Sequence, residues 1–197
     1  GMSTAGTLQL GDPSVIAART GVTTIGDFRT ADVALGGQGA PLTSFADQVI
    51  FGKSRTALGV LNLGGIANIT VIDCRGQAVM AFDTGPANVL IDEAMRILYQ
   101  REFDENGAVA ASGTPNGRML KELLALPYLH LAPPKTTGRE LFGRSMATAL
   151  VEQWQANDIS SADIVATLTA YTAASIVEAY ERFIAPEVVL NELVLAG

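Results

Sequence analysis

The chain has 197 residues, 48 % of them hydrophobic, and a formal net charge of −7 at pH 7. This length and composition are typical of a globular protein with a buried core, and they exclude a disordered chain. The acidic balance leaves no basic field that could displace counterions from a nucleic acid. We therefore expect small-molecule ligands and no nucleic-acid partner.

Cysteine content and hydropathy bound the compartment. Cys74 is the only cysteine, so no intrachain disulfide can form and a reducing cytoplasm is the expected location. No apolar run reaches the length of a membrane span, and no basic segment followed by an apolar stretch suggests a secretory signal. No Cys/His cluster suggests zinc, and we predict no metal-ligating set of side chains.

The first part of the chain predicts a loop followed by three strands. The glycine-dense stretch from Gly26 to Pro41 is expected to be a loop. Apolar runs predict strands over 57–63, 66–73 and 78–82, and Gly64-Gly65 suits a tight hairpin between the first two.

The remainder predicts helices and one further strand. The Gly85-Pro86 break is expected to start a helix that runs to about Tyr99, with Pro86 at its first position. A helix is predicted over 119–126, and a second long helix begins near Ser161, with apolar residues three and four apart. Residues 192–196 read as a strand. The pattern is therefore that of an α/β protein.

The first chemical cluster combines charged residues with a glycine-rich loop. Arg29 and Asp32 precede Gly36, Gly37, Gln38 and Gly39. Such a loop brings its backbone close to a ligand, and the charged side chains could grip hydroxyl groups. A surface loop with an Arg–Asp pair is the alternative.

The second cluster is the glycine hairpin, with Asn62 before it and Asn68 after it. Gly64 and Gly65 offer unobstructed amide hydrogens that could hold phosphate oxygens. No Gly-Lys-Ser/Thr follows, so this is not a Walker P-loop. A glycine-tipped hairpin without a ligand fits the local sequence equally well.

Two further clusters contain ionisable groups. Asp83 is expected at the end of the third strand, just before a helix N-terminus, where its carboxylate could accept a proton from water. It could instead merely cap the helix. Lys135, Thr137 and Arg139 could contact sugar or phosphate, or could be ordinary surface residues.

Together these four clusters resemble the anhydro-N-acetylmuramic acid kinase family in order and spacing. The family pattern is approximately Gly-Asp-Phe-Arg with Gly-Gly-Gln-Gly-Ala-Pro-Leu, then Leu-Asn-Ile-Gly-Gly-Ile-Ala-Asn, Asp-Thr-Gly-Pro-Gly-Asn and Pro-Lys-Ser-Thr-Gly-Arg-Glu. The match runs from about Leu8 to the C-terminus. Ala87 stands in place of the family's glycine, Thr136 in place of its serine, and Thr30 where some members have a second arginine.

The resemblance implies an ATP- and Mg²⁺-dependent enzyme that acts in peptidoglycan recycling. Such an enzyme opens the 1,6-anhydro ring of anhydro-N-acetylmuramic acid with water and phosphorylates O6, and Asp83 matches its general base. The phosphate- or nucleotide-binding residues implied are Asn62, Gly64, Gly65, Asn68 and Gly85. The substrate-binding residues implied are Arg29, Asp32, Gly37, Gln38, Gly39, Lys135, Thr137 and Arg139.

The resemblance also implies a ribonuclease-H-like, actin-like ATPase fold. We expect residues 1–56 to end an N-terminal lobe and residues 57–197 to begin a C-terminal lobe, with a helical insertion at about 101–160. The family's opening Met-Ser-Gly-Thr-Ser-Leu-Asp-Gly and late Cys-Gly-Gly-Gly segments are not found here. We therefore expect a fold incomplete at both ends, an inactive fragment, and pairing into a homodimer through an exposed sheet edge.

Two alternatives remain open. The chain could belong to a noncatalytic sugar-binding or regulatory relative of the kinase fold. It could also belong to an unrelated hydrolase that uses Asp83 and Asp32 as a carboxylate pair.

Overall fold

A computed structural model describes residues 10–37, 39–40 and 42–197, which form two compact units divided after Leu42. The first unit holds helices α1 (Pro13–Thr20) and α2 (Phe28–Ala34). Helix α1 begins after Asp12, whose carboxylate accepts hydrogen bonds from the backbone N–H groups of the first turn, and it ends at Gly21 in the left-handed conformation.

Helix α2 corrects the prediction of a loop from Gly26 to Pro41. Residues 28–34 form a helix, and the glycines that suggested a loop follow its end. Thr30 Oγ1 donates a hydrogen bond to Asp27 Oδ1 over 2.6 Å, which orders the first turn. Gly36, with φ of 90°, then lets the backbone leave the helix.

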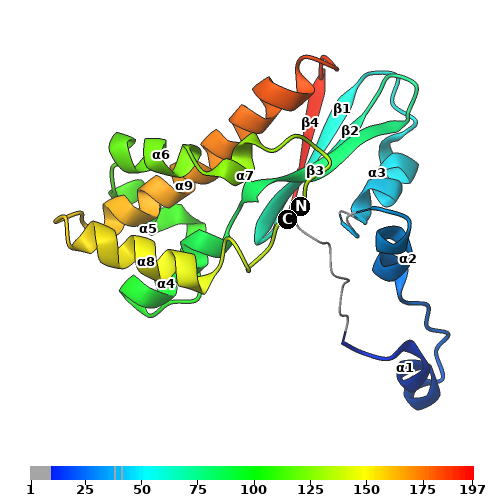
Figure 1. The fold of residues 1–197 in the computed structure, drawn as a ribbon, viewed down its shortest axis with the longest axis horizontal. Helices are drawn as coiled ribbons and strands as arrows, with labels where there is room; N and C mark the ends of the chain where they lie inside the picture. The colour runs from blue at the N-terminus through cyan, green and yellow to red at the C-terminus, as the bar shows by residue number, and fades with distance from the viewer. Residues whose placement is uncertain (1–9, 38, 41) are drawn as a thin grey trace. The chain divides into compact units, whose positions relative to one another are not determined.

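The second unit is built on a four-stranded sheet in the order β3-β2-β1-β4 (Figure 1). Strands β1, β2 and β3 form an antiparallel meander, and β4 pairs in parallel with β1. The four predicted strands are confirmed: three of them differ by at most one residue at an end, and the third continues four residues further than predicted. Their bounds are β1 Leu58–Leu63, β2 Ile66–Ile72, β3 Ala78–Pro86 and β4 Glu192–Ala196.

The two faces of the sheet are covered by different helices. One face packs Leu61, Ile69 and Phe82 against the end of helix α9 (Ser161–Ala179) and the π-helical turn Tyr180–Ile184 that follows it. On the other face, Phe51 of helix α3 (Thr43–Phe51) packs on an apolar cluster at the start of β1 and the end of β2. Thr70 of β2 also donates a hydrogen bond to Asp47 of α3, over 2.7 Å.

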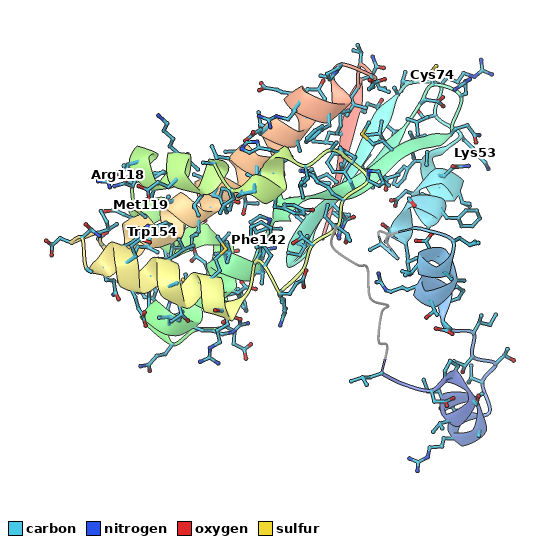
Figure 2. The ribbon with its side chains drawn as sticks, viewed as in Figure 1. Lys53, Cys74, Arg118, Met119, Phe142 and Trp154 are labelled. Carbon is cyan, nitrogen blue, oxygen red and sulfur yellow. The ribbon has the colours of Figure 1, made fainter. Side chains whose placement is uncertain are left out.

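A cluster of helices extends beyond the sheet and holds the larger core (Figure 1). Helix α9 runs from this cluster to the sheet and contacts most of the other helices. Figure 2 shows Met119, Phe142 and Trp154 in this cluster, with Cys74 at the opposite end, on the β2–β3 turn. The remaining elements are α4 Val89–Tyr99, η1 Glu105–Gly107, α5 Ala108–Ser112, α6 Gly117–Leu124, α7 Pro127–His130 and α8 Arg144–Gln155.

The start of helix α4 differs from its prediction. Strand β3 continues through Pro86, which pairs with Ile66, and the helix begins only at Val89. Pairing with β2 therefore prevails over the helix-starting tendency of Gly85-Pro86. Asp83 consequently lies inside a strand, and the prediction that it stands at a helix N-terminus is wrong.

Candidate active site

Three polar side chains form a row across the sheet. Asp83 of β3 lies opposite Asn68 of β2, which lies opposite Asn62 of β1. Directly opposed residues point to the same face of a sheet, so these three residues, named here the polar row, share one face. Because Asn68 is two residues from Thr70, the row lies on the face that carries α3. The structure thus brings together three residues that the sequence assigned to one site.

The carboxylate of Asp83 is held by the segment that runs along the edge of β3. Thr136 Oγ1 donates a hydrogen bond to Asp83 Oδ2 over 2.7 Å, and the Thr137 backbone N–H donates to the same oxygen over 2.9 Å. Asp83 is only 5 % exposed. Both donors stabilise the charged carboxylate, which is the form that a general base requires.

The glycine hairpin follows the polar row along β1. Gly64 lies two residues beyond Asn62, a distance of about 7 Å along a strand. The carbonyl oxygens of the hairpin are occupied, because Asn88 N donates to Gly64 O and Ala87 N to Gly65 O, each over 3.0 Å. Gly65 itself is exposed. The hairpin and the carboxylate therefore lie at the same end of the sheet.

Lys135 is buried next to this site and is only 5 % exposed. Its Nζ donates hydrogen bonds to Leu129 O over 2.9 Å and to Tyr128 O over 3.2 Å. The ammonium also lies 4.8 Å from the ring centroid of Phe183 and 4.9 Å from that of Tyr128, within the range of cation–π attraction. Burial, and next the charge of Arg182, lower the pKa of Lys135 to about 8, and Glu178 opposes the change.

Tyr128 connects the same segment to the backbone of Asp83. Its hydroxyl donates a hydrogen bond to Asp83 O over 2.8 Å. Burial raises the pKa of this phenol far above its ordinary value, and the negative charges of Asp83 and Glu140 act in the same direction. Tyr128 therefore stays protonated and remains a hydrogen-bond donor.

The predicted residues of the first unit are gathered with one another. Arg29 Nη1 donates a hydrogen bond to Gly39 O, and Gly39 N donates to Asp32 Oδ2 over 2.7 Å. Gly37 N donates to Asp32 O over 2.8 Å, and a Cβ on Gly37 would collide with the Asp32 carboxylate. Both charged side chains thus hold the shape of the loop. Their approach to a sugar stays a prediction, and Gln38 lies outside the described residues.

Two predicted residues are placed away from the polar row. Gly85 pairs with Ala67 and faces α9, where a Cβ would come within 3.1 Å of Ser175 Oγ. Arg139 is exposed, and its charge opposes the rise that burial causes in the pKa of Asp92 on α4. The roles of Gly85 in phosphate binding and of Arg139 in substrate binding remain predictions.

Sequence reasoning missed Thr136 and Tyr128 as members of the site. The signal for Thr136 was its hydroxyl, which is retained where the resembled family has serine. Tyr128 gave no local signal, because it reaches Asp83 across 45 positions of the chain.

A nucleotide site in a kinase also needs ligands for a metal ion. Among the described residues, no group of three or more His, Cys, Asp or Glu side chains is placed to hold a metal ion. Mg²⁺ in kinases takes one or two carboxylates together with substrate phosphates. Asn62 and Asn68 of the polar row offer amide oxygens beside the glycine hairpin, which suit a metal that is bound mainly through substrate phosphates. In the same part of the chain, no helix has both the length and the apolar character for a membrane crossing.

Comparison with known proteins assigns the family. A family profile described as anhydro-N-acetylmuramic acid kinase matches residues 2–197. The chain belongs to this family. Curated relatives carrying that name include proteins from Salinibacter ruber, 46 % identical over 193 residues, and Caldanaerobacter subterraneus, 44 % identical over 195 residues. A Bacillus cereus relative of the same name is 41 % identical over 193 residues.

These comparisons cover nearly all of the chain and half of each relative. The matches span 97 % of this chain, 49 % of the Salinibacter and Caldanaerobacter proteins and 50 % of the Bacillus protein. The chain therefore spans about half the length of the curated relatives it matches. The family resemblance inferred from the four sequence clusters is confirmed.

Proposed function

We propose that the full-length protein is an ATP-dependent kinase of anhydro-N-acetylmuramic acid, acting in the cytoplasm in peptidoglycan recycling. In this reaction water attacks the anomeric carbon of the 1,6-anhydro sugar, and the C1–O6 bond breaks. The released O6 then attacks the γ-phosphorus of ATP, and ADP leaves. Asp83 accepts the proton of the attacking water.

The observation that carries this proposal is the polar row with its supporting donors. A general base must be ionised, oriented and close to the water that it activates. The hydrogen bonds from Thr136 and Thr137 orient the Asp83 carboxylate and favour its charged form. Asn62 and Asn68 lie beside it on the same face, and their amides are suited to hydroxyl or phosphate oxygens. The glycine hairpin beyond the row supports a neighbouring phosphate site.

ATP and Mg²⁺ are implied by the kinase family, and the amides of Asn62 and Asn68 with the glycine hairpin would face the phosphates of the nucleotide. When bound with the nucleotide, Mg²⁺ neutralises charge on the phosphates. The chain's own residues orient the carboxylate and hold the proton taken from water at Asp83.

We further propose that the sheet is part of a ribonuclease-H-like fold. An antiparallel meander of three strands, followed by helices and a fourth strand parallel to the first, supports this assignment. In such a lobe, nucleotide and sugar would meet at the end of the sheet that holds the hairpin.

Replacement of Asp83 by asparagine tests the role of the base. The variant Asp83→Asn in the full-length protein is expected to form the 6-phosphate of N-acetylmuramic acid about 10²–10⁴-fold more slowly, because an amide cannot accept the proton. Product is measured with radiolabelled ATP. Asp73→Asn is the matched control: this carboxylate lies on the β2–β3 turn, so the rate should stay within about twofold.

Measurements of sugar binding and of ring opening without ATP, made beside this assay, separate the competing functions. Sugar binding without phosphate transfer by the wild-type protein would favour a noncatalytic relative. Ring opening without ATP would favour a hydrolase. Unchanged turnover in Asp83→Asn would reject Asp83 as the base.

A further inference from the structure

A closed ring of hydrogen bonds links the backbone of Asp83 to Lys135 and Tyr128. Asp83 N donates to Lys135 O over 3.1 Å, Lys135 Nζ donates to Tyr128 O over 3.2 Å, and Tyr128 Oη donates to Asp83 O over 2.8 Å. Each residue therefore donates to the next and accepts from the previous one. The ring joins strand β3, the segment that carries Lys135, and helix α7 at one point.

We propose that Lys135 is a positioning residue, which fixes the Asp83 carboxylate by clamping the segment that carries Thr136 and Thr137. This inference rests on the proposed function, since it assigns Lys135 a role in the reaction that Asp83 serves. Lys135 precedes Thr136 directly, so a displacement of its backbone also moves Thr136 and Thr137, which both donate to the Asp83 carboxylate. The proposal differs from the substrate contact that the family resemblance implied.

The direction of the Lys135 side chain supports the positioning role. Thr136 turns toward the carboxylate of Asp83, whereas Lys135 turns toward Phe82, which lies on the other face of β3. There its ammonium lies among the rings of Phe82, Tyr128 and Phe183. A cation enclosed in this way makes its hydrogen bonds to the protein rather than to a sugar.

Several charged groups surround the ammonium. Glu178 of α9 and Arg182 of the following turn both act on Lys135, and they pair with each other over 3.0 Å. His130 of α7 contacts the same Glu178 carboxylate over 3.3 Å. Asp83 lies on the other side of the ring of hydrogen bonds, and the negative charge of Glu140 raises the pKa of Tyr128. Because burial lowers the pKa of Lys135 to about 8, its charge is lost as the pH rises through this value.

The ring can be opened at two different bonds in the full-length protein. Lys135→Met removes the ammonium and keeps the chain length, whereas Tyr128→Phe removes only the hydroxyl. Both variants are expected to lower kcat about tenfold, with the sugar KM within about threefold of wild type. In wild type and Tyr128→Phe, kcat should fall as the pH rises, with a midpoint near pH 8. In Lys135→Met, kcat should show no such fall. Lys135→Arg, which stays charged, should recover part of kcat and should also show no fall near pH 8. Circular dichroism checks that this variant is folded.

A second measurement does not depend on the reaction. Hydrogen exchange of the Asp83 amide, which donates to Lys135 O, should be faster in Lys135→Met and Tyr128→Phe, while the Ile69 amide in the middle of the sheet keeps its protection. Unchanged Asp83 exchange in both variants would overturn the ring. If exchange changes but the wild type phosphorylates no anhydro sugar, the proposed function fails and the ring stands. A raised sugar KM with unchanged kcat in Lys135→Met would show substrate binding and overturn the positioning role.

Discussion

The hydroxyl of Thr136 donates one of the hydrogen bonds that orient the carboxylate of Asp83. Thr136→Val keeps the shape of the side chain but removes this donor, while the backbone N–H of Thr137 still donates to the carboxylate. A hydrogen bond to a charged group contributes about 1.5–3 kcal/mol, so we expect kcat to fall at least about tenfold.

Thr136→Ser serves as the matched control, because it retains the hydroxyl and loses one methyl group. Its kcat should stay within about threefold of wild type, since serine can donate the same hydrogen bond. Equal losses in the two variants would mean that packing of the methyl group, and not the hydrogen bond, matters at this position. Steady-state kinetics of both proteins at one pH decides between these outcomes.

The sequence indicated Asp83 as the reactive carboxylate, but it did not indicate how the residue is held. Its local motif suggested a helix N-terminus, yet the donors come from Thr136 and Thr137, 53 and 54 positions later. Contacts over such separations depend on how the chain packs, and local propensities do not contain that information. The family resemblance assigned both segments to one site, but it did not show the hydrogen bonds between them.

At the scale of elements, two glycines near the hairpin have different tasks. A Cβ on Gly65 would lie 3.8 Å from its nearest neighbour, Val89 Cβ, which is an ordinary contact, and Gly65 is not among the residues with positive φ. Structure alone therefore does not require glycine there. Its lack of a side chain is instead explained if phosphate oxygens approach the backbone closely.

The variant Gly65→Ala tests this interpretation. Its free energy of unfolding should stay within about 0.5 kcal/mol of wild type, because the added methyl group finds space. Its KM for ATP should rise several-fold, because the methyl group would stand between phosphate and backbone. Gly85→Ala is the contrasting variant: its Cβ would come within 3.1 Å of Ser175 Oγ, and we expect a loss of about 1–3 kcal/mol in stability. Thermal unfolding and ATP kinetics separate the two, and an unaltered KM in Gly65→Ala would argue against a phosphate site.

Strands were predicted better than helix boundaries. Runs of β-branched and aliphatic residues identified β1, β2 and β4, because such runs suit a buried sheet. The start of α4 was missed because Gly85-Pro86 is locally typical of a helix start, whereas pairing of Pro86 with Ile66 extends the strand. The helix over residues 28–34 was hidden by the glycines that follow it.

At the scale of the whole molecule, Lys135 links stability to pH. Its pKa is lowered from 10.5 to about 8 in the folded protein, so between these values the unfolded chain binds more protons. The contribution of Lys135 to the free energy of unfolding therefore rises as pH increases from about 8 to 10.5, by on the order of 3 kcal/mol. Below pH 8 the buried charge lowers stability.

Lys135→Met should thus be at least as stable as wild type at pH 7, although less active. The stability difference between the two proteins should shrink or reverse between pH 8 and pH 10, because all other groups titrate similarly in both. Urea unfolding at several pH values measures this difference. A constant difference over that range would mean that Lys135 titrates normally.

Neither the division into two units nor the position of its boundary could be derived from the sequence. The structure divides the chain after Leu42, and each unit has its own local contacts. The predicted lobes, the predicted homodimer and the contribution of Arg29 and Asp32 to a common cleft remain predictions, because each depends on long-range assembly rather than on local pattern.

Thr84 is an extra residue in the pairing of β3 with β2. Asp83 lies opposite Asn68, yet Gly85 lies opposite Ala67, so Thr84 has no partner of its own in the ladder. The bulge lets Asp83 lie on the face that carries α3, while Gly85, two positions later, faces helix α9. Without the bulge, Thr84 would take its own place in the ladder, and Gly85, two positions after Asp83, would share the face of Asp83. The bulge therefore decides which layer each residue after Asp83 reaches, and a substitution that removed it would exchange the two layers from Gly85 onward.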